Sequence, residues 1–201
     1  MKKSGFTLVE MLVVIGIIAI LSAASLVGYS RIIKASRKSK NVELVSNVAT
    51  ALTHILSKEG EWPQELVDGF KGGSGVLDKD VAKVFIRHKL LGVSYNQKTG
   101  SEGSYVLVGK DRCGIVDAEA ETVLKRPSAS ESTSVPSGGN VRDHILRYAI
   151  DEDGDGIVES DFGRIRASAI VWSAGPDGKV EYNLRGRNDD VYSWRPGQIV
   201  R

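Results

Sequence analysis

The sequence has almost none of the residues that build covalent cross-links or thiolate metal centres. Cys113 is the only cysteine among 201 residues, so an intrachain disulfide and a cluster of cysteine ligands are both excluded. No His-Cys pair has the spacing of a catalytic nucleophile. We therefore interpret Cys113 as a small buried side chain.

Histidine is also scarce, and the catalytic motifs that use it are missing. His54, His88 and His144 are dispersed, with no His-x-x-x-His pair, nucleophile elbow or phosphate-binding loop. Asp143 and His144 are adjacent, but we place them on a strand, where neighbouring side chains point to opposite faces. An anchored periplasmic enzyme is therefore the least favoured hypothesis, and we predict that the chain is not an enzyme.

Net charge is small, and the charged residues are unevenly placed. The formal charge is +2, which argues for no particular partner. No charged residue lies between Glu10 and Arg31, whereas a basic cluster occupies residues 31–40. Such a cluster beside a membrane segment can contact anionic lipid or nucleic acid. We prefer a solvated face that keeps the helix from sinking into the bilayer, and we expect no nucleic-acid partner.

An apolar stretch runs from Phe6 to Tyr29, long enough to cross about 30 Å of hydrocarbon as a helix. A cleaved secretory signal is the main alternative, with a small-residue cleavage site at 22–24. The apolar core of such a signal has only about 7–15 residues. An ordinary signal anchor leaves Glu10 unexplained, because an acid at that depth costs about 2.5–3.5 kcal/mol on insertion scales.

A partner for Glu10 would arise if the chain were cut between Gly5 and Phe6, which creates a new α-amino group. Residues 2–12, KKSGFTLVEML, closely resemble the N-terminus of type IV prepilins and of the pseudopilins of type II secretion. The resemblance implies that a prepilin peptidase cuts after Gly5 and methylates the amine of Phe6. It also implies that Glu10 pairs with a neighbouring subunit's N-terminus during assembly. Val27 departs from the pattern, because many members carry a helix-kinking proline there.

Helical periodicity continues beyond the apolar stretch. One apolar stripe recurs at three- and four-residue spacing, and we expect it to pack on a domain of the same chain. Its members are Val42, Val45, Val48, Ala49, Leu52 and Ile55. Gly60 and Pro63 predict the end of this helix. A helix from Phe6 to Lys58 would extend roughly 80 Å at 1.5 Å per residue.

The rest of the chain predicts a small mixed domain. We expect a helix over 80–91, a loop over 127–140, and strands over 105–108, 145–150, 167–172 and 179–183. The fold class is therefore α+β and pilin-like: a long N-terminal helical spine, its first half transmembrane, packed on a small antiparallel β-sheet domain. The predicted organisation is a leader over 1–5, a transmembrane half over 6–30, a periplasmic helical half over 31–59 and a globular domain over 60–201.

An acidic loop places Asp151, Asp153 and Asp155 at alternating positions before a glycine. This spacing is typical of the first half of a calcium loop. The second half differs, because position twelve is Phe162 and the nearest acid is Asp161. The alternative is an acidic turn whose carboxylates bond their own backbone.

A second acidic region joins residues 173–178 to residues 188–194. In this chain order the two segments resemble the C-terminal calcium loop of the major pseudopilin, the general secretion pathway protein G family. The helix end at Trp62-Pro63 is similar to the same family. The resemblance implies calcium ligands at Asp177, Asp189 and Asp190, with weaker candidates at Ser173 and Asn188.

The leading functional hypothesis is a structural subunit of a type II secretion pseudopilus. By resemblance, the chain would be a single-pass inner-membrane protein whose C-terminal domain lies in the periplasm. Its partners would be identical and related subunits, the prepilin peptidase and the inner-membrane secretion platform, with energy from a separate ATPase. The alternative is a type IV pilin or minor pilin for adhesion, motility or DNA uptake. Such pilins often carry a C-terminal disulfide, which Cys113 alone cannot form.

Overall fold

The computed structural model describes residues 8–90, 114–120, 141–182 and 189–200. The chain divides into two units, Met1–Ser39 and Lys40–Arg201. Several predicted features lie outside the described residues. They are the cleavage site at Gly5 and Phe6, the strand over 105–108, the predicted burial of Cys113, the loop over 127–140, and Asn188.

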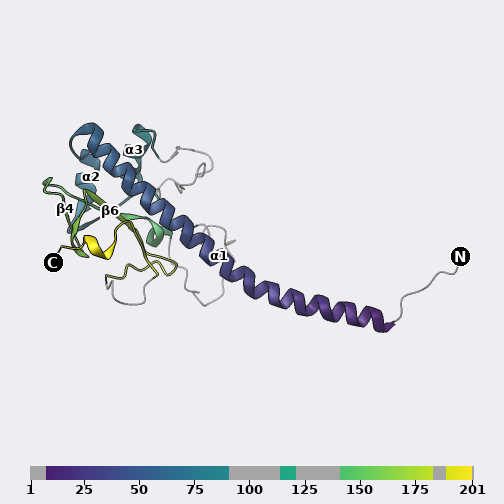
Figure 1. Ribbon diagram of the computed structural model, residues 1–201. Coiled ribbons are helices and arrows are strands. Elements are labelled where there is room, and N and C mark those ends of the chain that lie inside the picture. Colours follow the sequence, from purple (N-terminus) through teal and green to yellow (C-terminus); the bar gives the residue numbers. More distant parts are fainter. Residues whose placement is uncertain (1–7, 91–113, 121–140, 183–188, 201) are drawn as a thin grey trace, which may run out of the picture. The chain divides into compact units, whose positions relative to one another are not determined.

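The predicted N-terminal helix is confirmed. Helix α1 spans Leu8–Glu59, and it contains no proline that would remove a backbone hydrogen bond (Figure 1). All residues from 8 to 22 are exposed. We predict a membrane-crossing helix over 6–30, but within the described residues no helix has both the length and the apolar character to cross a membrane.

The second half of α1 buries one face, as its periodicity predicts. Val45, Val48, Leu52 and Ile55 are fully buried, whereas Val42 is 50% exposed and lies outside the buried stripe. The helix ends where expected. Gly60 adopts a left-handed φ of 80°, and its N–H donates to Leu56 O over 2.8 Å.

A five-stranded antiparallel sheet forms the centre of the second unit. Its strands follow the order β1-β2-β3-β6-β7. Their bounds are Phe70–Lys71, Ser74–Val76, Arg147–Ile150, Ala169–Ser173 and Val191–Tyr192. A separate hairpin pairs β4 (Ile157–Ser160) with β5 (Gly163–Arg166). The sheet and the helices establish the predicted α+β, pilin-like class.

Short helices complete the second unit. These are α2 (Gln64–Gly69), α3 (Lys79–Arg87), η1 (Val141–His144) and η2 (Pro196–Gln198). Asp78 caps α3, because its carboxylate accepts the N–H groups of Asp80 and Val81. The helix is shorter than the predicted 80–91: it stops before Lys89, whose φ of 54° is incompatible with a helix.

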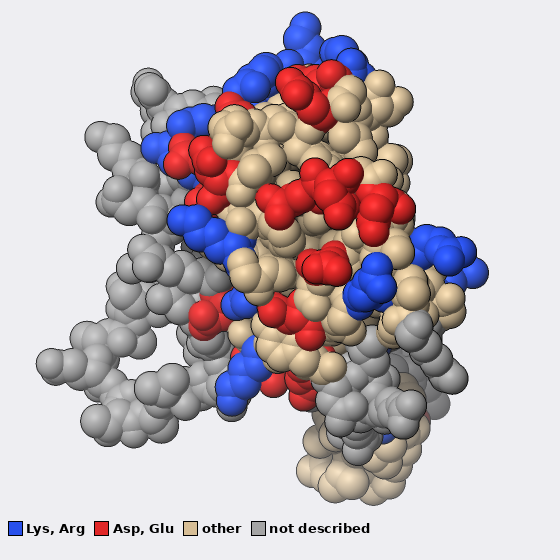
Figure 2. All heavy atoms as spheres, turned by 90° about the vertical axis from the view of Figure 1, so that its left-hand side faces the viewer, with Lys and Arg blue, Asp and Glu red and all other residues tan. Residues whose placement is uncertain are grey.

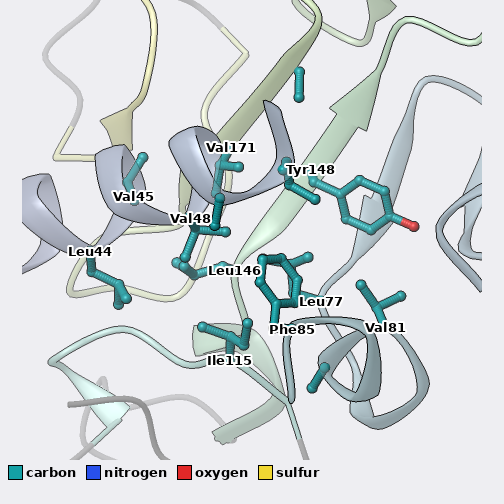
Figure 3. Close-up of a cluster of buried hydrophobic side chains, with 14 of the residues drawn as sticks. Leu44, Val45, Val48, Leu77, Val81, Phe85, Ile115, Leu146, Tyr148 and Val171 are labelled. Atoms are coloured by element: carbon teal, nitrogen blue, oxygen red, sulfur yellow. The ribbon is translucent and has the colours of Figure 1, made fainter. Parts of the chain in front are cut away.

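The main core lies between α1, α3 and the sheet. Val48 of α1 and Phe85 of α3 converge near Leu146 (Figure 3). Tyr148 of β3 is fully buried, and its hydroxyl donates to Leu66 O over 2.6 Å. A smaller aromatic core surrounds Phe162 on the opposite face of β3 and β6. Its rings are Phe162, Trp172, Tyr182, Tyr192 and Trp194.

Two local predictions are wrong, and one hairpin is absent from the prediction. Residues 179–182 are not a strand, because the N–H of Glu181 bonds the Asp190 side chain; β7 pairs with β6 instead. His144 lies in the 3-10 turn η1, not on a strand. The hairpin β4–β5 is missing from the sequence prediction, because two four-residue strands are too short to display a clear period.

Candidate functional sites

The first candidate site is the N-terminal half of α1. Glu10 lies in the first helical turn, where a carboxylate interacts favourably with the helix dipole. The side chains around it are large, apolar and exposed. Leu8 is 81% exposed, Leu12 60% and Ile20 71%. A run of apolar side chains this long marks a surface that another protein or a membrane covers.

The second candidate site is the loop between β3 and β4. Asp151, Asp153 and Asp155 each offer a carboxylate oxygen, and these oxygens lie within 4.8 Å of one another. Asp151 is buried, and its carbonyl accepts the indole N–H of Trp62 over 2.5 Å. The structure therefore brings together the three carboxylates that the alternating spacing predicts, and oxygen donors are the ligands that calcium prefers.

The same carboxylates also bond their own loop. Asp151 accepts the N–H groups of Gly154 and Gly156, each over 2.8 Å. Asp155 accepts the N–H of Ile157 over 2.7 Å. This is the acidic turn that the sequence offers as the alternative. The two arrangements are compatible, because each carboxylate oxygen carries two lone pairs.

Asp161 is separate from that group. It lies in the turn between β4 and β5 and lines a hollow of about 350 Å³ with Glu152, Glu159 and Phe70. Figure 2 shows acidic side chains gathered across the middle of one face of the molecule. Within the described residues, the only group of three or more acidic, histidine or cysteine side chains with converging ligand atoms is the Asp151 group.

The third candidate site joins the turn at 175–178 to the segment before β7. Gly175 has a φ of 64°, and a Cβ there would lie 2.8 Å from Asp189 O, so only glycine permits this approach. Asp177 is exposed, and its carboxylate accepts the N–H of Lys179 over 2.9 Å. The structure thus brings the two predicted segments side by side. It does not bring Asp177, Asp189 and Asp190 into one converging group.

Asp190 is the buried acid of this region. Its Oδ2 accepts the N–H of Glu181 over 2.7 Å and the hydroxyl of Tyr192 over 2.9 Å, whereas its Oδ1 is buried without a partner. Burial raises the pKa of Asp190 to about 6, and the negative charges of Glu181 and Asp189 act in the same direction.

Glu181 is the second acid of this region with an unpartnered oxygen, because its Oε2 is also buried without a hydrogen-bond partner. Two buried carboxylate oxygens without donors are unfavourable unless a proton or a cation neutralises them. Sequence reasoning missed Glu181, because it lies in the predicted strand. Ser173, by contrast, donates its hydroxyl to Asp117 over 2.6 Å.

Comparison with known proteins identifies the N-terminal region. Residues 1–26 match the family described as the prokaryotic N-terminal methylation motif. The chain is a type IV prepilin-like protein. Its match contains Gly5, Phe6 and Glu10, whose roles in cleavage, methylation and assembly stay predictions.

Curated relatives of this prepilin-like chain are filament proteins. The type IV major pilin protein PilE of Neisseria gonorrhoeae is 27% identical over 47% of this chain and 57% of its own length. A fimbrial protein of Neisseria meningitidis serogroup B is 29% identical over 54% of this chain and 62% of its own length. A fimbrial protein of serogroup A is 29% identical over 43% and 51%, respectively.

The prepilin-like chain therefore spans between about half and three fifths of the length of these relatives. No solved structure matches it. The likeness to the general secretion pathway protein G family stays a prediction.

Proposed function

We propose that this prepilin-like chain is a structural subunit of a helical filament and has no catalytic role. The exposed apolar surface of α1 over residues 8–22 carries the proposal. Covering a large apolar side chain contributes about 1.5–3 kcal/mol, so a surface of this size strongly favours association with lipid or with other subunits. The N-terminal methylation motif of the chain supports the same role, and so does its similarity to a type IV pilin and a fimbrial protein.

A surface pilus of the type IV class is our first candidate for the filament, because the curated relatives are pilins and fimbrial proteins. A periplasmic pseudopilus of type II secretion is the second candidate. It is favoured by the order of the turn at 175–178, the acidic pair Asp189-Asp190 and the nearby Trp194. Localisation of the assembled filament, outside the cell or within the periplasm, separates the two.

Assembly would begin in the inner membrane, with the C-terminal unit in the periplasm. A prepilin peptidase would cut after Gly5 and methylate the new amine of Phe6. Glu10 would then pair with the N-terminal amine of a neighbouring subunit. Because a carboxylate is unfavourable in an apolar surrounding, such pairing rewards one stagger between subunits over others.

We further propose that calcium stabilises the second unit at one or both acidic loops. Asp190 and Glu181 would hold it near β7 through their buried oxygens, and the Asp151 group would hold it between β3 and β4. When bound, calcium would supply positive charge that these carboxylates otherwise lack, and it would need no flanking helices.

The test of the filament role is the substitution Glu10→Leu, with Glu43→Leu as its matched control. Both glutamates are exposed on α1, but only Glu10 lies in the matched motif. We expect Glu10→Leu to insert into membranes normally and to reduce filament yield at least tenfold, while Glu43→Leu assembles as wild type. Electron microscopy and shearing assays measure the yield, and normal assembly by Glu10→Leu would refute the role of Glu10.

Mass spectrometry of the mature N-terminus is the companion measurement. We expect a chain that begins at N-methylated Phe6. A chain that begins at Ser25 would show that the apolar stretch is a cleaved secretory signal, and the filament proposal would fail.

A further inference from the structure

A buried polar cluster lies where three distant parts of the second unit meet. Asp117 belongs to segment 114–120, His144 ends η1 and Ser173 ends β6. All three residues are at most 3% exposed. The Ser173 hydroxyl donates to Asp117 Oδ2 over 2.6 Å, and His144 Nδ1 lies 3.3 Å from Asp117 Oδ1. The cluster shares no residue with the exposed apolar surface of α1 over residues 8–22.

The Asp117 carboxylate is surrounded by hydrogen-bond donors. Besides Ser173 and His144, it accepts the N–H groups of Glu119 over 2.9 Å and Ala120 over 3.2 Å. An ionised carboxylate accepts all of these bonds, whereas a protonated one would lose an acceptor. A nearby positive charge stabilises a buried carboxylate, and the imidazolium form of His144 would supply one in direct contact.

The groups that face His144 are mostly negative. Asp117 and Glu119 face it from segment 114–120, and Asp143 precedes it on η1. Burial lowers the pKa of His144, but the hydrogen bond to Asp117 and these three negative charges outweigh burial. The pKa of His144 therefore lies above the ordinary histidine value.

The turn at 175–178 packs on the other side of the ring. A Cβ at Gly178 would lie 2.9 Å from Asp143 Cβ and 3.7 Å from His144 Nε2. The charged residues next to Gly178 are Asp177 and Lys179, and both are exposed. They are thus screened by water, and the buried charges on the 114–120 side dominate.

We propose that Asp117, His144 and Ser173 form a pH-sensitive lock, closed in acid by an imidazolium–carboxylate pair and weakened when His144 loses its proton. Neutral His144 can still donate from Nδ1 to Asp117, but the charge that compensates the buried carboxylate is gone. The lock therefore loosens without losing every hydrogen bond, as expected for a switch.

The elements that the lock joins are also linked by backbone and side-chain hydrogen bonds. The N–H of Asp117 donates to His144 O over 2.9 Å, which ties segment 114–120 to η1. Asn41 of α1 accepts the N–H of Ala118 over 2.7 Å. Because β3 and β6 are held by their own ladder of paired residues, loosening the lock should free segment 114–120 and the turn at 175–178 before the sheet itself opens.

The direction of the pH effect follows from proton linkage. A group with a raised pKa in the folded state binds its proton more tightly there than in the unfolded chain. Its stabilising effect is complete below the unfolded pKa of histidine and disappears as pH rises through the folded pKa. The second unit is accordingly most stable in mildly acidic surroundings, as far as His144 is concerned.

The first test is an NMR titration of the full-length chain in detergent micelles. The sequence has three histidines, so His54→Gln and His88→Gln variants identify the His144 resonance by elimination. We expect its titration midpoint to lie above the ordinary histidine value. A midpoint at or below that value would overturn the proposal.

The second test is thermal melting as a function of pH. Between about pH 6.5 and pH 8.5, we expect Tm of the wild type to fall by about 2–4 °C more than that of His144→Gln. Asp117→Asn should show the same flattened profile, and His54→Gln should follow the wild type. Equal pH dependence in wild type and His144→Gln would contradict the lock. If His144→Gln does not fold, Asp117→Asn and the NMR midpoint decide.

Hydrogen exchange tests whether the pH effect is confined to the lock. A purely structural role of these residues predicts no local, pH-dependent change in amide protection. After correction for intrinsic exchange rates, protection of segment 114–120 and residues 173–178 should fall across the same pH range. Protection of β3 should stay constant over that range. A uniform loss across the sheet would instead indicate global destabilisation.

Discussion

Helix α1 contains two regions with the same secondary structure and opposite surroundings. Leu12, in the first region, is 60% exposed, whereas Leu52, in the second, is completely buried. Between Glu10 and Ser22 the first region is apolar on all sides, and the second places its apolar residues on one face. A one-sided stripe can be covered by the chain's own domain, while an all-round apolar surface needs a surrounding partner. The comparison teaches that one end of the helix contributes to the folded core, while the other end leaves its apolar surface exposed, as the proposed filament role requires.

The largest expected effect comes from making the same leucine-to-alanine substitution in each region. Leu52→Ala should destabilise the second unit by about 2–5 kcal/mol, because it leaves a cavity in the core. Leu12→Ala should leave the stability of the isolated subunit unchanged and impair filament assembly. Urea unfolding and filament yield measure the two outcomes. Equal loss of stability in both variants would erase the distinction between the regions.

Removal of calcium should affect the second unit, because that unit contains both acidic loops. At a calcium concentration of 100 times Kd, bound ion contributes about 2.7 kcal/mol, so a chelator should lower Tm by several degrees. Asp190→Asn should remove part of this response, and Glu159→Gln, in an exposed position, should keep it. A Tm that is insensitive to both calcium and chelator would refute the structural ion.

A smaller effect tests where the two regions meet. Asn41 is 2% exposed and follows the first residue of the second unit. Asn41→Ala removes the acceptor for the N–H of Ala118, and the free energy of unfolding should fall by about 1–3 kcal/mol. Val42→Ala, at a half-exposed neighbour, should change it by less than about 0.5 kcal/mol. Comparable losses in the two variants would mean that the buried face of α1 does not begin at Asn41.

Local pattern was sufficient to predict several parts of this molecule. The stripe through Val45, Val48 and Leu52 predicted the buried face of α1, because a period of 3.6 residues is a local property. Gly60 predicted the helix end, because a glycine cap is also a local signal. The alternation of Asp151, Asp153 and Asp155 predicted that their carboxylates converge, since all three belong to one short loop.

Other parts depend on residues that are far apart in the sequence. Residues 179–182 have a strand-like composition, yet the side chain of Asp190 binds the N–H of Glu181. Lys89 ends α3 through a backbone conformation that no motif signals. Glu181 is a candidate ligand only because the fold buries its Oε2 and bonds its backbone N–H to Asp190.

The sequence alone determined the prepilin-like N-terminus, the long helix and the α+β class. These follow from charge, spacing and periodicity within short segments, which survive in any environment the helix enters. Only the tertiary structure decided which acids are buried and that Asp117 meets His144 and Ser173. Burial and buried pairing depend on which distant segments share one small volume, and no local pattern contains that information.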